Sequence, residues 1–319
     1  MNANLVDDIA NAVLYEGYML YPYRLSAVKN RQRWNFGVLY PRAFADSQQG
    51  ADRWSMQTEC LVRTACSDGV VHVRVRFLQL MERSVEGQAP QGWQEGKERE
   101  VSIHGLHLSA IALQPAQRQF QFAGGFESDE SISRRVDQID GVVNVEAQEL
   151  ENGLFRVLIQ VLNTRETSDG SFSSREQALM QSLASAHTIV EIEGGEFISM
   201  IDPPERYSEA VAQCKNLGTW PVLVGEPGER NTMLSSPIIL YDYPQIAPES
   251  AGALFDGTEI DEILTLRIMT LTDEEKVEMR HGDERARQIL ERTELMPPEQ
   301  LMKMHGALRG FRRAGQETP

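Results

Sequence analysis

"VVNVEAQELENGLFRVLIQVL", residues 142–162, decides the fold class of this 319-residue chain. Asn152 and Gly153 separate two runs in which apolar side chains alternate with other residues. An Asn-Gly pair between such runs is a strong short-range signal of a tight turn, and it predicts a β-hairpin. The sequence therefore predicts antiparallel sheet in this part of the chain.

Similar alternation predicts further strands before this hairpin. TECLVRTAC (58–66) and VVHVRVRFLQL (70–80) flank Asp68-Gly69, and this pattern predicts a second hairpin that turns on Asp-Gly. Six or seven strands at these spacings are typical of a β-sandwich or a partly open barrel. Other strands are expected from Trp34 to Tyr40, near 100–107 and near 117–122, with a long loop at 83–97.

Helical patterns occur at both ends of the chain. Leu5, Ile9 and Val13 form an apolar stripe that predicts a short helix over residues 4–16. Near the C-terminus, Thr272 and Glu275 have the spacing of a capping box, in which each residue's side chain bonds the other's backbone N–H. We therefore expect helices in the last part of the chain, from about residue 258 onward.

The polar, turn-rich segment 163–176 is the predicted domain boundary. We predict an α+β protein in which an N-terminal antiparallel β-sandwich or barrel-like domain (1–165) is followed by a mixed α/β domain (166–319) with a helical C-terminal tail. Within the second domain the pattern predicts helices near 174–186 and 204–215 and strands at 188–193, 197–202, 220–225 and 237–243.

The composition restricts the class of function. The formal net charge is −16 and the pI is near 4.9, so the mean field of the chain repels phosphates and argues against nucleic-acid or anionic-membrane binding. We find no secretory signal and no apolar run long enough to span a membrane, and we expect a cytoplasmic protein. The three cysteines, Cys60, Cys66 and Cys214, fit reduced thiols better than a disulfide framework.

No motif of a known catalytic site is present in the sequence. There is no phosphate-binding GxxxxGK[ST] loop, no dinucleotide-binding glycine pattern, no HExxH, no GxSxG and no paired CxxC. His104 and His107 lie three apart on a predicted strand, so they reach one metal only across a bulge at Gly105. We therefore predict no catalytic residue, no cofactor and ordinary strand histidines.

Acidic residues cluster between positions 242 and 262. Carboxylates that converge near a helix N-terminus can hold a hard cation, and this favours a metal-dependent or otherwise unfamiliar enzyme that also uses His281. Helix capping and the helix dipole explain Glu259, Asp261 and Glu262 equally well. The candidate metal ligands on the first interpretation are Asp242, Asp256, Glu259 and Glu262.

A local basic and aromatic run is unusual in so acidic a chain. It occupies residues 21–42, and arginine with tyrosine and tryptophan is the composition of interface anchors. Single-stranded nucleic acid, an anionic ligand, or internal pairing with the 47 acidic residues are the other interpretations. The predicted partner-binding residues are Tyr21, Tyr23, Arg24, Lys29, Arg31, Arg33 and Trp34.

Two long strings resemble a known family: "LYEGYMLYPYRLSAVKNRQRWNFGVLYP" (14–41) and "PIILYDYPQIAPESAGALFDGTEIDEILTLRIMTLTDEEKVEM" (237–279). The family is an uncharacterised one encoded in gene clusters of high-affinity, oxygen-insensitive nickel–iron hydrogenases. The resemblance implies a role in the maturation, assembly or use of a hydrogenase, with a hydrogenase subunit or maturation protein as partner. It does not imply that the chain is itself a hydrogenase, because the paired CxxC ligands are absent. A non-enzymatic accessory or assembly factor is therefore the leading hypothesis.

Overall fold

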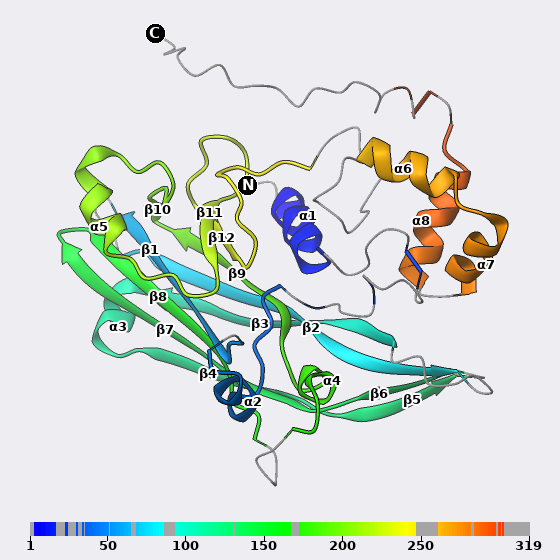
Figure 1. The fold of residues 1–319 in the computed structure, drawn as a ribbon. Coiled ribbons are helices and arrows are strands. Elements are labelled where there is room, and N and C mark those ends of the chain that lie inside the picture. The colour runs from blue at the N-terminus through cyan, green and yellow to red at the C-terminus, as the bar shows by residue number, and fades with distance from the viewer. Residues whose placement is uncertain are drawn as a thin grey trace. The chain divides into compact units, whose positions relative to one another are not determined.

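The protein is represented by a computed structural model, in which the chain forms two compact units (Figure 1). Unit 1 consists of Met1–Gly17 and Gln32–Gln245, and unit 2 of Tyr18–Arg31 and Ile246–Pro319. The division differs from the predicted boundary near residue 165, which lies inside unit 1. The structure describes residues 3–16, 23–24, 30, 34, 36–50, 52–64, 68–85, 93–129, 132–166, 172–246, 261–281, 284–297, 299–300 and 302.

Unit 1 contains two antiparallel sheets, which confirms the predicted α+β class. In both sheets, strands from before residue 165 pair with strands from after it, which is why no domain boundary lies there. The five-stranded sheet has the order β10 (Gly195–Phe197), β1 (Ser55–Thr64), β8 (Leu154–Asn163), β7 (Ile139–Glu151), β4 (Ala116–Phe122). The other has the order β11 (Trp220–Leu223), β12 (Thr232–Ser236), β9 (Ala184–Glu193), β2 (Val70–Val85), β6 (Ile132–Val136), β5 (Gly125–Asp129), with β3 (Trp93–His107) paired to β2.

The main core lies between the inner faces of the two sheets. Val62 of β1 and Val143 of β7 come from the five-stranded sheet, and Val73 of β2 and Val190 of β9 come from the other. All four side chains are inaccessible to solvent and belong to one apolar cluster. Of the two predicted architectures, the structure is therefore a β-sandwich, in which two sheets bury their facing apolar sides.

The hairpin predicted at Asn152-Gly153 is confirmed as β7 and β8. Gly153 has a φ of +77°, which L-residues rarely adopt, and a Cβ at this position would lie 2.7 Å from the backbone oxygen of Thr64. Glycine is therefore required both by the backbone conformation and by the close approach of a neighbouring strand.

The predicted hairpin at Asp68-Gly69 is wrong, because β1 and β2 lie in different sheets. The Asp68 carboxylate instead accepts hydrogen bonds from Ser109, at 3.0 Å from the backbone N and 2.6 Å from Oγ. Gly69 accepts one from the backbone N of Leu108 at 2.9 Å. These contacts join the start of β2 to the start of α3 (Leu108–Leu113).

Two further predictions near the N-terminal half are wrong. No strand forms between Trp34 and Tyr40 in the described residues: Trp34 has a φ of +62°, Leu39 makes isolated bridges only, and α2 (Arg42–Ser47) follows. The predicted loop at 83–97 is shorter, because β2 continues to Val85 and β3 begins at Trp93. Register pairs such as Arg83 with Trp93 extend the two strands well past the main core.

Short helices cover the outer faces of the sandwich (Figure 1). The predicted N-terminal helix is confirmed as α1 (Ala3–Leu14), and its Val6, Ile9 and Val13 pack against Ile189 of β9. The predicted helices at 174–186 and 204–215 are shorter than expected. They form α4 (Arg175–Leu179) and the pair η2 (Glu205–Tyr207) and α5 (Ser208–Ala212), and Tyr207 packs against β1 and β8.

The described part of unit 2 is helical, as predicted for the C-terminal tail. It contains α6 (Asp261–Met269), α7 (Asp273–His281) and α8 (Glu284–Glu294), and α8 packs against the other two. The capping box is confirmed, because Thr272 Oγ1 accepts from the N of Glu275 at 3.2 Å while the Glu275 carboxylate accepts from the N of Thr272 at 3.0 Å. No helix in the described residues is long and apolar enough to cross a membrane.

Candidate functional site

The described members of the predicted partner-binding set, Tyr23, Arg24 and Trp34, do not form an exposed docking surface. Tyr23 and Trp34 are only 1% and 7% exposed, so they cannot supply free contact area to a partner. Arg24 pairs with Glu275 at 3.1 Å and with Glu278 at 3.9 Å, so internal pairing accounts for it. Tyr21, Lys29, Arg31 and Arg33 lie outside the described residues, and their partner-binding role stays a prediction.

The predicted metal ligands are not brought together by the described residues. The Asp242 carboxylate accepts hydrogen bonds from Ser199 Oγ at 2.5 Å and from the backbone N of Leu223 at 2.8 Å, so it positions the chain rather than facing a cation. His281 donates from Nδ1 to the backbone oxygen of Val277 at 2.8 Å. Asp256, Glu259 and the side chain of Glu262 lie outside the described residues.

A bulge at Gly105 separates the two predicted strand histidines. Gly105 has a φ of +72°, and the register of β3 against β2 shifts at this point. His107 turns toward Asp68, with Nδ1 3.1 Å from Oδ2, whereas the His104 ring lies 5.6 Å from the ring of His72. The bulge that would have joined His104 to His107 instead places His104 beside His72, a neighbour that the sequence pattern did not indicate.

His72 and His104 still lack the chemistry of a metal site. The backbone N of Gly105 donates to Nδ1 of His72 at 3.3 Å, which leaves the proton of the neutral ring on Nε2, 3.3 Å from the Glu193 carboxylate. A protonated Nε2 has no lone pair for a metal. In the described ranges, no group of three His, Cys, Asp or Glu side chains could hold a metal ion.

The cysteines that the structure describes are structural residues. Burial raises the pKa of the Cys60 thiol, and burial also raises the pKa of Cys214. Thiols of raised pKa are poor nucleophiles, because the thiolate is the reactive form. Cys66 lies outside the described residues.

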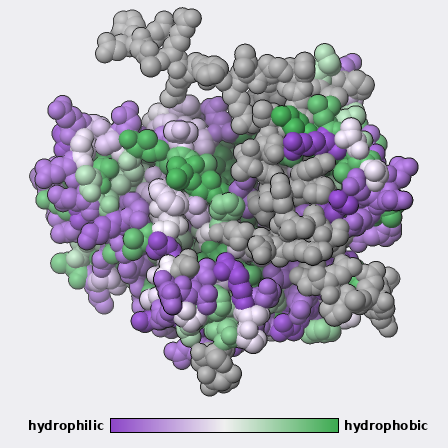
Figure 2. Space-filling model, viewed as in Figure 1, coloured by the Kyte–Doolittle hydropathy of each residue, from purple (hydrophilic) through white to green (hydrophobic). Residues whose placement is uncertain are grey.

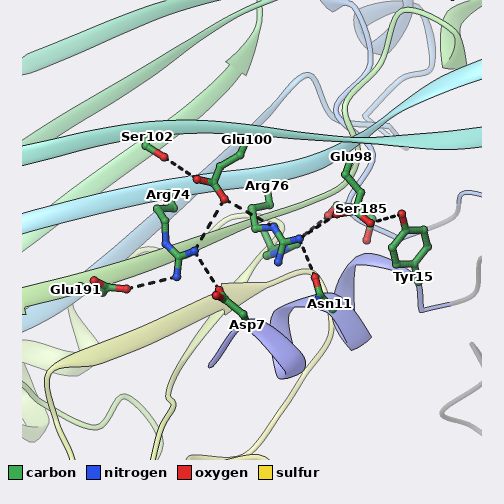
Figure 3. A network of polar contacts seen from close by, with 11 residues as sticks. Asp7, Asn11, Tyr15, Arg74, Arg76, Glu98, Glu100, Ser102, Ser185 and Glu191 are labelled. Atoms are coloured by element: carbon green, nitrogen blue, oxygen red, sulfur yellow. Dashed lines mark hydrogen bonds and ion pairs between the residues drawn. The ribbon is translucent and has the colours of Figure 1, made fainter. Parts of the chain in front are cut away.

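Two arginines of β2 stand at the centre of a network of polar contacts (Figure 3). Arg74 lies 3.0 Å from the Asp7 carboxylate of α1 and 3.4 Å from that of Glu191 in β9. Arg76 donates to Asn11 Oδ1 of α1 at 2.7 Å and lies 3.3 Å from the Glu98 carboxylate of β3. The network therefore connects α1 to β2, β3 and β9, and both guanidinium groups bond to acceptors within the chain.

A buried histidine lies beside this network. His187 is fully inaccessible to solvent, and its Nδ1 lies 3.0 Å from the backbone oxygen of Ser185, so Nδ1 carries the proton and donates it. Nε2 has no hydrogen-bond partner. Burial lowers the pKa of His187 to about 4, and the positive charges of Arg76 and Arg74 act in the same direction.

The strongest candidate for a functional surface is the segment from Pro237 to Tyr243, which we call the docking segment. Two hydrogen bonds anchor it to Leu223 of β11: the backbone N of Tyr243 donates to the Leu223 oxygen at 2.7 Å, and the Asp242 carboxylate accepts from the backbone N of Leu223 at 2.8 Å. Tyr243 Oη also donates to the oxygen of Glu229 at 2.9 Å. The segment is therefore held in a defined conformation, although it does not form the predicted strand.

Side chains of the docking segment alternate between the core and solvent. Ile238 and Leu240 pack against the apolar cluster under α1, whereas Ile239 and Tyr241 are 72% and 83% exposed. Trp220, the first residue of β11, is a further exposed aromatic and pairs in register with Ser236, just before the segment. In Figure 2 the surface over the β11–β12 region is apolar, while most of unit 1 around it is hydrophilic.

The sequence contained the signal for this surface, but its meaning was not apparent. The sequence predicts a strand at 237–243, and the structure forms none there. Ile239 and Tyr241 nevertheless lie on one side of the segment, as residues two apart in an extended chain do. Only the placement of the segment at the rim of the sandwich distinguishes an exposed apolar pair from a second buried face.

Comparison with known proteins adds no family assignment. No protein-family model matches the chain, and no curated protein sequence matches it. The geometry of the docking segment therefore carries the functional argument.

Proposed function

We propose that this chain is a non-enzymatic accessory factor that binds a partner protein through Trp220, Ile239 and Tyr241. The observation that supports the proposal is the exposure of Ile239 and Tyr241, at 72% and 83%, on a segment that hydrogen bonds hold in place. Large apolar side chains presented in this way are characteristic of interaction sites, because their exposure to water is unfavourable in the absence of a partner.

The chemistry of the three side chains fits an interface anchor. Tyrosine and tryptophan are enriched among residues whose truncation strongly weakens binding, because each buries a large area and loses little conformational entropy. Asp242 and Tyr243 fix the backbone beside Tyr241 before a partner arrives. Less ordering then opposes association, which favours affinity.

The partner that we propose is a nickel–iron hydrogenase subunit or one of its maturation proteins, met in the cytoplasm. The resemblance of residues 14–41 and 237–279 supports this choice, and the second string includes the docking segment. The charge of −16 favours a partner with a positive surface around its apolar pocket, because opposite potentials accelerate encounter.

The test is affinity purification of the chain from cells that express the hydrogenase, followed by mass spectrometry of the captured proteins. We expect wild type to retain hydrogenase or maturation proteins at moderate salt. The double variant Ile239→Ser, Tyr241→Ser should lose most of this capture, because each anchor contributes about 2 kcal/mol or more. The melting temperature should stay within a few degrees of wild type, since both side chains are exposed.

Leu113→Ser is the matched control. Leu113 is 90% exposed on α3, so the substitution removes a similar apolar side chain from another part of unit 1. Capture by this variant should equal that of wild type. Equal capture by the double variant and by Leu113→Ser would exclude the docking segment as the binding site. Recovery of the chain alone from cells that contain the hydrogenase would exclude the proposed partner.

A further inference from the structure

The free edge of β4 differs from the other edge strands of unit 1 in its charge. Strand β4 reads AQRQFQF and pairs only with β7, so its second edge carries no strand among the described residues. It contains one charged residue, Arg118, and no acidic one, in a chain with 47 acidic residues. Unpaired edge strands attract other strands unless charges or coverage prevent it.

Each of the other free edges in the described sheets is protected. An acidic residue occupies the centre of β3, β5 and β10, namely Glu100, Glu127 and Glu196. Two copies of such a strand, paired antiparallel about their centres, would place two carboxylates directly opposite each other. At β11 the docking segment covers the edge, through the bond from the N of Tyr243 to the oxygen of Leu223 at 2.7 Å.

At the centre of β4 stands Gln119, which is neutral and can both donate and accept hydrogen bonds. We infer that two copies of this chain associate by antiparallel pairing of β4 with β4 about a twofold axis at Gln119. The pairing would continue the five-stranded sheet across the axis, in the arrangement that gives a closed, symmetric dimer.

This register is complementary to itself on both faces of the sheet. On the outer face Gln119 meets Gln119 and Gln117 meets Gln121 of the second copy, which forms a ladder of amides. On the inner side Arg118 meets Phe120, so the one positive charge lies against an aromatic ring and not against its own copy. Phe120 packs against the main core, which fixes the orientation of the strand.

The outer face of the edge is also open to a second chain. A depression of about 460 Å³ lies over β4 and β7, and Gln119, Gln121 and Asp140 are among the residues that line it. Gln121 donates to Asp140 at 2.7 Å and Gln117 donates to Asn144 at 3.0 Å, so a cross-strand bond to β7 holds each of these amides in place. Their side-chain oxygens remain available as acceptors for the second copy.

Sedimentation analysis of the full chain tests the proposal, at protein concentrations from about 1 to 100 µM, a range that spans small, reversible interfaces. We expect wild type to dimerise reversibly within this range. Higher salt should strengthen the dimer, because each copy carries a charge of −16 and the long-range repulsion is screened. A monomer at every concentration and salt would overturn the proposal.

Charge substitutions at Gln119 test the register. Gln119→Glu and Gln119→Lys each place like charges opposite each other, and each should weaken self-association by about two- to five-fold. An equimolar mixture of the two variants should form a heterodimer above its statistical share in native mass spectrometry. Gln117→Glu, which faces Gln121 in the other copy, is the matched control and should weaken the dimer less. Self-association as strong in both Gln119 variants as in wild type would overturn the inference.

Discussion

His187 illustrates how burial at one residue sets a property of the whole protein. Its ring is fully enclosed beside Arg74 and Arg76, and burial lowers its pKa to about 4. In the unfolded chain the same side chain has a pKa of about 6.5. The folded state therefore holds the neutral ring at pH values where the unfolded chain has already bound a proton.

The linkage gives a pH prediction with a definite sign. Because the folded pKa is lowered, His187 has no effect on stability above about pH 6.5, and stability falls as the pH drops from there toward 4. At pH 5 the free energy of unfolding should be about 2 kcal/mol smaller than at pH 7 from this residue alone. Urea unfolding at the two pH values measures the difference.

The histidine variants separate this effect from that of other groups. His187→Gln should lower the stability at pH 7 but remove most of the loss between pH 7 and pH 5. His281→Gln, at an exposed position of α7, is the control for removing a histidine that is not buried. The same loss in all three proteins would show that His187 is not the group that titrates.

At this scale the sequence predicts residue types but not their neighbours. Asp242 and His104 were candidates because of what lies near them along the chain, whereas Ser199 and His72, their spatial neighbours, are more than 30 residues away. The internal pairing of Arg24 was one of the predicted alternatives, but nothing local indicates Glu275 as its partner.

Helix α1 illustrates an element held by polar and apolar contacts together. Its apolar stripe packs on β9, and Arg74 and Arg76 of β2 bond to Asp7 and Asn11 on the same helix. Twelve residues are too short for a stable isolated helix, so α1 depends on these contacts.

Removing one arginine should loosen this helix selectively. Arg76→Met leaves Asn11 and Glu98 without their shared donor and should cost about 1–3 kcal/mol in unfolding free energy. Hydrogen exchange should accelerate in α1 more than in β7 and β8. Arg135→Met, which removes an exposed pair with Glu82, is the control and should cost less than about 1 kcal/mol. Equal losses in both variants would contradict the role of Arg76.

Elements with a local signal were predicted well. The β7–β8 hairpin follows from Asn152-Gly153, and the start of α7 follows from its capping box, because in each case the chemistry lies within a few residues. The false hairpin at Asp68-Gly69 shows the limit of this reasoning. Asp-Gly is a common turn pair, but here the Asp68 side chain accepts a hydrogen bond from Ser109, some 40 residues later.

On the scale of the whole molecule, the chain enters unit 2 twice. Residues 18–31 and 246–319 form this unit, and the sandwich takes the rest. The predicted boundary at 165 failed because it relied on a polar stretch. Strands β9 to β12, which follow that stretch, complete the sheets begun by β1 and β2. Pairing between distant strands leaves no mark in local composition.

Unit 1 should fold without the C-terminal helices. The apolar clusters that the described residues of the sandwich form draw all their members from positions up to 245. We expect a fragment of residues 1–245 to keep its β-sheet circular dichroism and one cooperative unfolding transition. Calorimetry of the full chain should show an additional contribution from unit 2. A fragment that lacks near-ultraviolet circular dichroism, and hence fixed packing of its aromatic side chains, would show that unit 1 requires residues 246–319.

The pairing of β2 with β9 has a consequence for synthesis on the ribosome. β2 ends at Val85 and β9 begins at Ala184, so about 100 residues must be added before β2 gains this neighbour. At about 5–20 residues per second, the interval is roughly 5–20 s. During that time β2 can pair with β3 along one edge, but it lacks β9, which completes its sheet. The apolar residues of β2 therefore stay exposed, and we expect chaperones to bind the nascent chain at this stage.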